Sequence, residues 1–292
     1  MLVVVQEVSL SEKEWFSTVI PERNPVSSDL QKSRLLPFQR VSNFRDLGGY
    51  HCRDGRTVRW GKLFRSGHLA QASMADRRRL SRLGIRTLID FRSDQEITQE
   101  PDRLPEKAKI AVVALPIQQE GMPPLAGEIR QMIETRSLDG QDPDQTMIEM
   151  YRLLAVKYQA VYREFFQVLL SSKGKPVLWH CSAGKDRAGF AAALLLKVLG
   201  VPWQTILEDY LLSRGNIAPR RRQLLLVSLL RGRKAARYLQ RLNEVEGAWL
   251  QAAFQALEDR WGSFDGFTKN ALQLKNEDIH LIQNFYLAPS IL

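Results

Sequence analysis

A cysteine and an arginine six positions apart stand between two apolar runs, in the stretch PVLWHCSAGKDRAGF (176–190). Cys181 follows a predicted buried strand, and Arg187 opens a predicted helix. Backbone N–H groups of a short loop at a helix N-terminus bind anions, and the helix dipole adds a favourable potential. The same field lowers a cysteine pKa to roughly 3.5–7.5, so Cys181 is expected to be a thiolate nucleophile. Because Arg187 can hold two phosphate oxygens, the pattern predicts phosphoryl transfer.

The residues between the cysteine and the arginine are small or charged, as a loop around a phosphate requires. Small residues let the backbone approach the phosphate oxygens closely. The predicted phosphate-binding loop comprises Ser182, Ala183, Gly184, Lys185, Asp186 and Arg187. Lys185 is expected to add positive charge for a second phosphate or an acidic lipid headgroup. His180, directly before the cysteine, is expected to fix the loop through hydrogen bonding.

The leaving oxygen of a phosphate ester needs a proton, and two carboxyl groups are candidates to supply it. Asp186 lies inside the loop, next to Arg187. Asp90 ends the predicted strand 85–90, and the carboxyl ends of parallel strands share one rim, where ligands bind. The residue pattern alone leaves both carboxyl groups open as the catalytic acid.

A second His-Cys pair, in HCRDGRTVR (51–59), lacks the rest of the pattern. Six positions after Cys52 stands Val58, and no apolar helix follows. The Asp-Gly pair at 54–55 instead predicts a hairpin turn. Cys52 is expected to be structural, and a redox role, in which it protects Cys181 as a disulfide, is an alternative. Two cysteines and four dispersed histidines do not have the spacing of a zinc site, so no metal and no cofactor is expected.

Short apolar runs alternate with helical patterns around these residues. Turn signals divide residues 43–67 into two or three antiparallel strands. Further strands are predicted at 85–91, 109–117 and 177–180. Helices are predicted at 74–83, 147–170, 190–199 and 203–213. The alternation predicts an α/β fold with a mostly parallel central sheet flanked by helices.

Nearly every residue from about 203 to 260 fits a helical pattern, which predicts a helical cap or lid on this domain. Residues 1–40 are expected to form an N-terminal extension, before one domain at 41–292 that includes the cap. Within the cap, the segment 214–241 carries nine lysines and arginines and no acidic residue, interleaved with leucines. A lid over the site, a contact with an acidic membrane surface and a solvated face are three interpretations of this segment.

The chain of 292 residues, 44% hydrophobic and 25% charged, has the composition of an ordinary globular protein. Its net charge of +10 favours polyanionic partners. Nucleic acid is not expected among them, since stacking aromatics are absent between Arg214 and Arg237. The amino terminus lacks the basic region of a secretory signal, and the longest apolar run, 188–201, contains Lys197 and is too short for a membrane span. A cytoplasmic location, or export without a conventional signal peptide, is expected.

Beyond the loop, the sequence resembles the bacterial atypical tyrosine/lipid phosphatases, a family of secreted mycobacterial and listerial enzymes with the loop HCxxGKDRTG. The matching stretches are NFRDLGGY (43–50), LFRSGHL (63–69), LGIRTLIDFRSDQE (83–96) and GSFDGFTKNALQLKNEDIHLIQNFYL (262–287). The resemblance implies a tyrosine-phosphatase-like fold, no metal, and helices that lid the active site. It implies activity on phosphotyrosine and sometimes on phosphoserine, phosphothreonine or phosphoinositides. It also favours Asp186 over Asp90 as the acid.

Ala188 departs from the family's pattern, which has Thr or Ser after the loop arginine. In related cysteine phosphatases that hydroxyl donates to the thiolate and eases breakdown of the phosphocysteine. Its loss is expected to raise the pKa of Cys181 or to slow the second step. Four charged residues in the matching stretches are expected either to reach the site or to form internal ion pairs: Arg45, Asp46, Arg65 and Arg92.

The sequence therefore predicts an enzyme that hydrolyses phosphate monoesters through a cysteinyl-phosphate intermediate, on a phosphorylated protein or a phosphoinositide. One alternative, favoured by Ala188, is a phosphate-binding or phosphoinositide-binding module with little or no activity. Another is a rhodanese-like sulfurtransferase, which also uses a cysteine in a short anion-binding turn.

Overall fold

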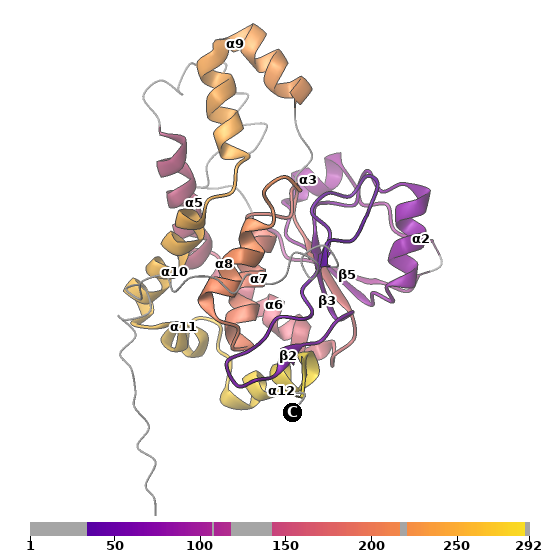
Figure 1. The fold of residues 1–292 in the computed structure, drawn as a ribbon, viewed down its shortest axis with the longest axis vertical. Helices are drawn as coiled ribbons and strands as arrows, with labels where there is room; N and C mark the ends of the chain where they lie inside the picture. The colour runs from indigo at the N-terminus through magenta and orange to yellow at the C-terminus, as the bar shows by residue number, and fades with distance from the viewer. Residues whose placement is uncertain (1–33, 107, 118–141, 217–220, 290–292) are drawn as a thin grey trace, which may run out of the picture.

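The computed structural model describes residues 34–106, 108–117, 142–216 and 221–289. At its centre lies a sheet of five strands, in which one edge strand is antiparallel and the others run parallel (Figure 1). From that edge across the sheet, the strands are β1 (Arg45–Asp46), β3 (Leu63–Ser66), β6 (Val177–His180), β4 (Thr87–Asp90) and β5 (Ala111–Ala114). The predicted mostly parallel sheet is thus confirmed.

The two faces of the sheet carry different parts of the core, because alternate residues of a strand point to opposite sides. On β6, Val177 and Trp179 belong to the large apolar cluster on one face, whereas Leu178 belongs to a smaller cluster on the other. All three side chains are buried, as expected of a strand covered on both faces. The central place of β6 brings its last residue, and the cysteine that follows, to the middle of the sheet's carboxyl rim.

Helices flank the sheet on both sides, as the sequence predicts. They are α2 (Met74–Arg82), α3 (Asp94–Gln99), α5 (Pro143–Val156), α6 (Gln159–Ser171), α7 (Arg187–Val198), α8 (Trp203–Leu211), α9 (Arg221–Leu242), α10 (Gly247–Trp261), α11 (Phe264–Asn270) and α12 (Asn276–Tyr286). Leu80 of α2 packs into the smaller cluster, whereas α5, α6, α7 and α10 pack into the large one. Figure 1 shows α2 on one side of the sheet and α6 to α8 on the other.

The apolar run 188–201 forms most of α7 and the turn after it. Nearly every side chain of α7 is buried, which confirms the prediction of a core helix. Gly200, with a φ of +83°, follows the helix at the place where the sequence predicts its end. In the described part of the chain, no helix combines the length and the apolar character needed to cross a membrane.

Residues 147–170, which have helical spacing throughout, lie in two helices instead of one. The break falls at 157–158, between α5 and α6. No glycine or proline marks it. Both helices bury their apolar faces in the large cluster, so the spacing of apolar residues continues across the break and could not locate it.

Residues 43–67 contain three short strands, as predicted, but only part of their pairing is local. β1 and β3 are antiparallel neighbours. A hairpin closes where the Cys52 N–H donates to the Arg56 carbonyl (2.8 Å), which confirms the predicted turn. β2 (Thr57–Val58) also pairs with β7 (Leu287–Ala288), so the C-terminal end of the described chain lies against this hairpin.

Of the segment 203–260 predicted to form a cap, only α9 lies apart from the main core (Figure 1). α8 and α10 instead pack into the large cluster, α10 through Trp249 and Phe254. α9 has a small cluster of its own, centred on Tyr238 and Leu239. Its regular helix is interrupted at Gly232, which has non-helical φ and ψ of 87° and 165°.

The predicted division of the chain at residue 40 stays a prediction, since residues 1–33 lie outside the described part. Residues 34–40 contact the domain closely. Leu35 pairs with Arg45 of β1, and the Leu36 N–H donates to the Phe44 carbonyl (3.0 Å). Arg34 is fully buried. These residues therefore extend the antiparallel edge of the sheet.

Candidate active site

Residues 181–186 form a loop between the end of β6 and the start of α7, and its carbonyl groups point outward. Each carbonyl from Ser182 to Lys185 accepts a hydrogen bond from outside the loop. The bonds run from the His68 N–H to Ser182 (3.2 Å), from the Asn43 amide to Ala183 (3.3 Å) and Gly184 (3.0 Å), and from the Arg65 guanidinium to Gly184 (2.7 Å) and Lys185 (3.3 Å). The C=O and N–H of one trans peptide unit point in opposite directions. The N–H groups of residues 183–186 therefore turn toward the centre of the loop, as an anion site requires.

At position 184 of the loop, only glycine fits the backbone conformation and the space. Its φ of +70° lies in the left-handed region, which glycine adopts without strain. A Cβ atom at this position would lie 2.3 Å from the carbonyl carbon of Ser66 and 2.6 Å from the nitrogen of Gly67. The loop thus rests directly on the end of β3, and a larger residue would lift it from that support.

Cys181 and Arg187 stand at the two ends of the loop, and both are almost wholly buried, at 2% and 5% exposure. Arg187 is the first residue of α7, so the positive end of the helix dipole faces the loop. The structure thus brings Cys181 and Arg187, which the sequence places six positions apart, to the same ring of inward N–H groups.

Glu96, which the sequence pattern gave no reason to select, fixes the guanidinium of Arg187. Arg187 Nη1 donates to Glu96 Oε2 (2.7 Å) and Nη2 to Oε1 (3.0 Å), a bidentate pair. The other two bonds from these nitrogens go to the Phe91 carbonyl (3.2 Å) and the Ser182 hydroxyl (3.0 Å). Ser182 in turn donates to Glu96. Nη1 and Nη2 of Arg187 are therefore both bonded, whereas its Nε–H has no acceptor among the described residues.

Both members of this pair stay charged around neutral pH. Burial by itself raises the pKa of Glu96, but the hydrogen bonds and charge of Arg187 lower it to about 2. Burial likewise disfavours the charged form of Arg187, but Glu96 and the nearby Cys181 raise its pKa above the ordinary value. A local signal did exist for Glu96, since Ser93 and Glu96 form the capping box that starts α3. That signal locates a helix start and says nothing about Arg187.

Asp209, buried on α8, anchors the outside of the loop. It accepts hydrogen bonds from Arg45 Nε (3.1 Å), Arg65 Nη1 (3.0 Å) and the Tyr50 hydroxyl (2.9 Å). Although burial opposes ionisation, the two arginines hold the pKa of Asp209 below its ordinary value. Arg65 therefore joins Asp209 to the loop carbonyls, whereas Arg45 is an internal ion-pair partner.

His180 is fully buried beneath the loop, in a cluster of charged groups. Its Nε2 lies 2.9 Å from Asp102 Oδ2, and its Nδ1 lies 3.4 Å from the Cys181 carbonyl. Arg92 Nη2 lies between two carboxylates, 2.7 Å from Asp90 Oδ2 and 3.0 Å from Asp102 Oδ2. Atoms of Asp90, Asp102 and His180 lie within 4.8 Å of one another, a spacing that could surround a metal ion, but the Arg92 guanidinium already contacts both carboxylates. These contacts support the predicted role of His180 in fixing the loop.

Two of the predicted carboxylates point away from the loop centre. Asp90 accepts hydrogen bonds from the backbone N–H of Arg92 and from its Nε and Nη2, and its side chain is only 4% exposed. Asp46 accepts from the N–H groups of Gly48 (2.8 Å) and Gly61 (2.7 Å) and so holds a turn. Arg92 and Asp46 thus have internal partners, which is the second of the two roles expected for them.

Asp186 lies closer to solvent than Asp90, with a side chain that is 21% exposed. The hydroxyl of Tyr151 donates to Asp186 Oδ1 (2.8 Å), and it also lies 2.6 Å from the hydroxyl of Tyr210. Burial, followed by the charge of Asp186, raises the pKa of Tyr151 well above its ordinary value, so Tyr151 remains a hydrogen-bond donor. Tyr151 of α5, whose hydroxyl is itself bonded to Tyr210 of α8, therefore orients this carboxylate, and nothing in the local sequence pointed to either tyrosine.

Lys185 has partners for its ammonium group within the protein. Its ammonium donates to the carbonyls of Leu242 (2.7 Å) and Glu244 (3.0 Å), at the junction of α9 and α10, and lies 3.2 Å from Asp186 Oδ1. It also lies 5.4 Å from the ring centroid of Trp249. Lys185 thus connects the loop to the end of α9, and its expected role toward a second phosphate or an acidic lipid headgroup stays a prediction.

Cys52 lies at the opposite end of α7 from Cys181. A Cβ on Gly200, just after α7, would be 3.9 Å from Cys52 Cβ, whereas Cys181 lies before the first turn of that helix. Twelve helical residues span about 18 Å, far more than the roughly 7 Å between Cα atoms that a disulfide allows. The redox-partner hypothesis is therefore wrong. Burial raises the pKa of Cys52 to about 11, which agrees with a structural role.

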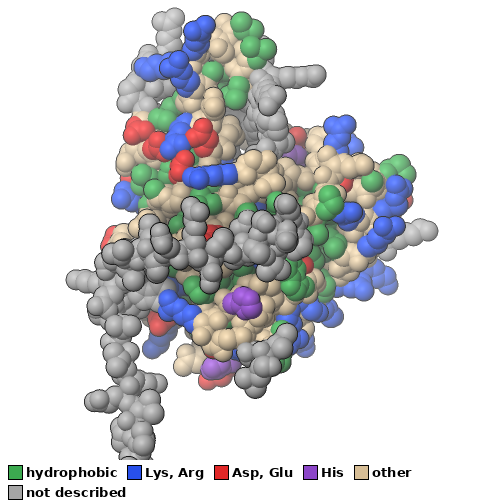
Figure 2. All heavy atoms as spheres, in the orientation of Figure 1, with side chains coloured by type: hydrophobic (Ala, Val, Ile, Leu, Met, Phe, Trp, Pro, Cys, Tyr) green, Lys and Arg blue, Asp and Glu red, His purple; other side chains and the backbone are tan. Residues whose placement is uncertain are grey.

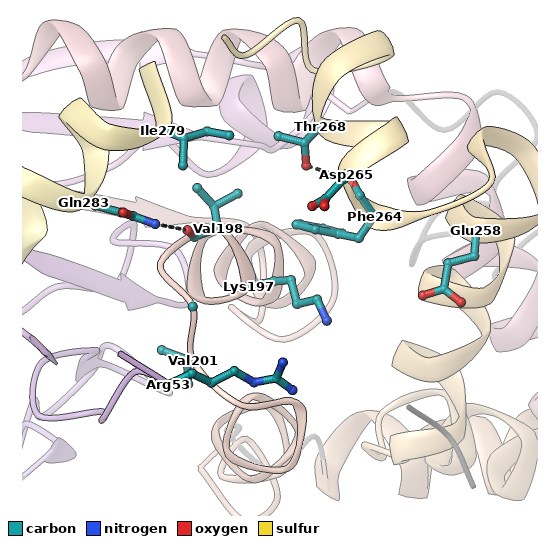
Figure 3. A pocket seen from close by; sticks show the side chains of 11 residues that line it. Arg53, Lys197, Val198, Val201, Glu258, Phe264, Asp265, Thr268, Ile279 and Gln283 are labelled. Carbon is teal, nitrogen blue, oxygen red and sulfur yellow. Dashed lines mark hydrogen bonds between the residues drawn. The ribbon is translucent and has the colours of Figure 1, made fainter. Parts of the chain in front are cut away.

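A cavity of about 320 Å³ opens beside the C-terminal end of α7, between that helix and the helices α11 and α12 (Figure 3). Lys197 and Arg53 point toward it from one side, and Asp265 from another. Gln283 donates to the Val198 carbonyl at its edge (3.1 Å). Because the catalytic loop lies at the other end of α7, this cavity is separate from the candidate active site.

The fold and the loop together place a ring of inward N–H groups at the carboxyl rim of a mostly parallel sheet. The chain belongs to the tyrosine phosphatase family, which it matches over residues 36–288. It is 36% identical over 270 residues to a protein of Cupriavidus necator named as a tyrosine-protein phosphatase, with 92% of this chain and 94% of that protein covered. It is 28% identical over 255 residues to the triple specificity protein phosphatase PtpB of Mycobacterium tuberculosis, covering 78% and 91% of the two chains. The protein is accordingly a hydrolase of phosphoric monoesters.

Solved phosphatase structures are related more distantly. A phosphatase structure from Neisseria meningitidis has 20% sequence identity and a TM-score of 0.31, and covers 56% of this chain and 90% of that one. TpbA of P. aeruginosa has 21% identity and a TM-score of 0.28, with 68% and 90% covered.

Proposed function

We propose that the protein hydrolyses phosphate monoesters in two steps through Cys181. The thiolate sulfur forms a bond to phosphorus while the bond from phosphorus to the leaving oxygen breaks, and Asp186 gives that oxygen a proton. A water molecule then attacks the phosphocysteine and loses a proton to Asp186, and the S–P bond breaks. Inorganic phosphate leaves, and the thiolate is restored. The loop N–H groups and Arg187 stabilise both transition states.

The observation that carries this proposal is the outward bonding of the loop carbonyls, which preorients the N–H groups around one point before any phosphate binds. Arg187 Nε–H is available to the phosphate, and Nη2 becomes available if the Ser182 hydroxyl gives way. These two donors supply the bidentate grip that the sequence predicted. Glu96 keeps the guanidinium in place while this exchange occurs.

The hydrogen bonds of the two candidate acids support Asp186. Asp90 accepts several hydrogen bonds from Arg92 in a buried pair, and a proton delivered from it would break that pair. Asp186 is part of the loop, is more exposed, and is oriented by Tyr151. We therefore assign proton transfer to Asp186 and a positioning role to Asp90, which holds Arg92 next to His180.

Leaving-group dependence tests the assignment of the acid. A leaving group such as para-nitrophenolate departs without a proton, whereas a phenolate or alkoxide does not. Asp186→Asn should therefore slow hydrolysis of phenyl phosphate by about 10²-fold or more and affect para-nitrophenyl phosphate far less. Asp90→Asn should slow both substrates equally, through the loop. Equal losses in Asp186→Asn, or a selective loss in Asp90→Asn, would reverse the assignment.

The nucleophile is tested by trapping. After rapid acid quenching of a reaction with para-nitrophenyl phosphate, mass spectrometry of the wild type should find phosphate on Cys181, and Cys181→Ser should have no turnover. Full activity in Cys181→Ser would end the proposal.

Ala188 favours a second candidate, a module that binds phosphate with little hydrolysis. Ala188 is fully buried at the start of α7, and its carbonyl accepts from Trp179 Nε1 (3.0 Å). Its side chain offers no hydroxyl to the thiolate. If this slows breakdown of the intermediate, Ala188→Ser should raise the steady-state rate and lower the fraction of trapped phosphocysteine. Phosphate affinity without turnover in both proteins would favour the binding module. The sulfurtransferase alternative is disfavoured by membership of the phosphatase family.

For substrates, we propose phosphotyrosine in proteins, with phosphoserine, phosphothreonine or phosphoinositides in addition. The support is the 28% identity with a phosphatase named for triple specificity. The test is to measure kcat/KM of the wild type on a panel of phosphopeptides and soluble phosphoinositides, with Cys181→Ser as the inactive control for each substrate. Activity on none of these classes would contradict this part of the proposal.

A further inference from the structure

The segment that contains α9 differs from the rest of the chain in charge. Residues 214–241 carry nine lysines and arginines and no acidic residue, whereas the whole chain has 42 basic and 32 acidic residues. α9 stands at one end of the molecule, outside the main core (Figure 1). The segment thus carries positive charge without the acidic residues that accompany it elsewhere in the chain.

α9 also exposes leucines that its own packing does not use. Its contacts with the small cluster come from Tyr238, Leu239, Leu224, Val227, Ala235 and Leu242. Leu225 and Leu229, which are four positions apart and so share a face of the helix, are 63% and 75% exposed. Leu229 is the most exposed large hydrophobic residue of the described part of the chain.

Exposed cations follow these leucines along α9, beyond the kink at Gly232. Arg233 and Arg237 are exposed and contact no carboxylate among the described residues. Nearer the body, by contrast, Arg241 is neutralised by Asp144, Glu244 and Glu246. Figure 2 shows lysine, arginine and hydrophobic side chains near one another at the end where α9 lies, with acidic side chains gathered closer to the body. The outer part of the helix thus combines exposed apolar groups with positive charge.

We infer that the outer face of α9 docks on an anionic phospholipid bilayer. Leucines on a helix surface enter the boundary of headgroups and acyl chains, and flanking arginines bind lipid phosphates and serine headgroups. Each lysine or arginine near an anionic surface contributes about 1 kcal/mol. This inference adds a partner to the proposed function, since it places the catalytic loop beside a membrane that contains phosphoinositides.

Two other occupants fit the surface less well. A second copy of the chain would bring the same positive helix against this one, in a protein whose net charge is already +10. Nucleic acid would satisfy the charge but would leave Leu225 and Leu229 exposed to water. An anionic bilayer satisfies the charge and the apolar groups together.

The docking helix is connected to the catalytic loop. Lys185 of the loop donates to the carbonyl of Leu242, the last residue of α9, and to that of Glu244 just beyond it. A displacement of α9 at the membrane would therefore move the side chain of Lys185, which lies next to Asp186. We expect the rate on a lipid-embedded substrate to exceed the rate on the same headgroup in solution.

Vesicle flotation measures the docking directly. Cys181→Ser protein is mixed with phosphatidylcholine vesicles that contain no phosphatidylserine or about 30% of it, at low salt. The protein should bind the anionic vesicles at least tenfold more tightly. In the same background, Leu225→Gln with Leu229→Gln, and separately Arg233→Ser with Arg237→Ser, should each weaken binding about tenfold. Because the measurement uses an inactive protein, failure of the catalytic proposal would not affect it.

The matched control is Met74→Gln on α2, since Met74 is 66% exposed but lies outside the basic segment. It should bind vesicles like the parent. All of these variants, made with Cys181 intact, should hydrolyse soluble para-nitrophenyl phosphate at the wild-type rate, which excludes misfolding. Equal binding to neutral vesicles, no loss of binding in the α9 variants, dimerisation through α9, or preference for nucleic acid over anionic vesicles would each overturn the inference.

Discussion

Neutralising Glu96 separates the charge that holds Arg187 from the shape of the site. Glu96→Gln keeps the size of the side chain and removes its charge. Despite burial, the pKa of Glu96 falls from 4.5 to about 2 in the folded protein, mainly through Arg187 and also through hydrogen bonds from Ser182 and the Ser93 N–H. Each unit corresponds to about 1.4 kcal/mol, so the ionised Glu96 side chain contributes about 3 kcal/mol at neutral pH. The Glu96 side chain is 19% exposed and that of Arg187 6%, so solvent screens this interaction only in part. Glu96→Gln should therefore lower the free energy of unfolding by about 3 kcal/mol and lower kcat/KM by at least about tenfold, because Arg187 loses its alignment.

The pH dependence of this difference follows from the sign of the shift. A carboxylate whose pKa is lowered on folding stabilises the protein fully above its unfolded pKa and loses that contribution as the pH falls toward its folded pKa. Urea unfolding of wild type and Glu96→Gln should thus differ by a constant amount above about pH 5.5, and the gap should close between about pH 4.5 and 2. Glu100→Gln, at the C-terminal end of the same helix, is the control, since Glu100 is 54% exposed and 3.7 Å from His68. If Glu96→Gln is as stable as Glu100→Gln at pH 7, or if the gap does not change with acid, the reasoning is wrong.

Three further outcomes test the parts of the loop. Gly184→Ala should abolish measurable vanadate binding in calorimetry, because the added Cβ would collide with the backbone of Ser66. Gly61 has a similar φ of +73°, but a Cβ there would meet nothing within 4 Å, so Gly61→Ala should lower the free energy of unfolding in urea by only about 1 kcal/mol. Asp209→Asn leaves two buried arginines without their shared carboxylate, and urea unfolding should show a loss of about 3–5 kcal/mol; a loss below about 1 kcal/mol would show that other groups compensate. Cys52→Ala should leave the rate with para-nitrophenyl phosphate and its sensitivity to peroxide unchanged, and a changed sensitivity would restore a redox role.

The loop between β6 and α7 could be predicted from sequence because its information is local. A buried strand, a cysteine, a run of small residues and an arginine at a helix start lie within 176–190, and each has a physical reason there. The sheet was predictable for the same reason, since short apolar runs between helical patterns indicate parallel strands.

The residues that hold the loop were not predictable in the same way. Glu96 lies 91 positions from Arg187 in sequence, and Tyr151 lies 35 positions from Asp186. Both meet their partners only because β4, α5 and α7 converge at one rim. A carboxylate three residues into a helix indicates a capping box, and a tyrosine on an amphipathic helix indicates a core position, so local reasoning explains both residues without their roles in the site. Contacts of this range follow from topology.

For Lys185 and the cap, the local interpretation gives the residue types and the helices but not the contacts that they make. A lysine in a phosphate-binding loop is expected to face phosphate, and residues 203–260 are indeed helical. However, Trp249 and Phe254 bury α10 in the main core, and this fixes the carbonyls of 242 and 244 close to the loop. A buried ammonium needs acceptors, and these carbonyls provide them.

The charges around the loop show where the attraction for phosphate comes from. Five cations and five carboxylates contact the loop or its immediate partners: Arg45, Arg65, Arg92, Lys185 and Arg187, and Asp90, Glu96, Asp102, Asp186 and Asp209. Every one of these cations contacts at least one of these carboxylates, and five against five cancel. The surplus of positive charge on the chain therefore does not by itself draw a dianion into the loop. What remains is the set of inward N–H groups and the start of α7, which carry partial positive charge without a counterion. The carboxylates keep the cations in place, so in the proposed mechanism the inward N–H groups bind the phosphate together with Arg187.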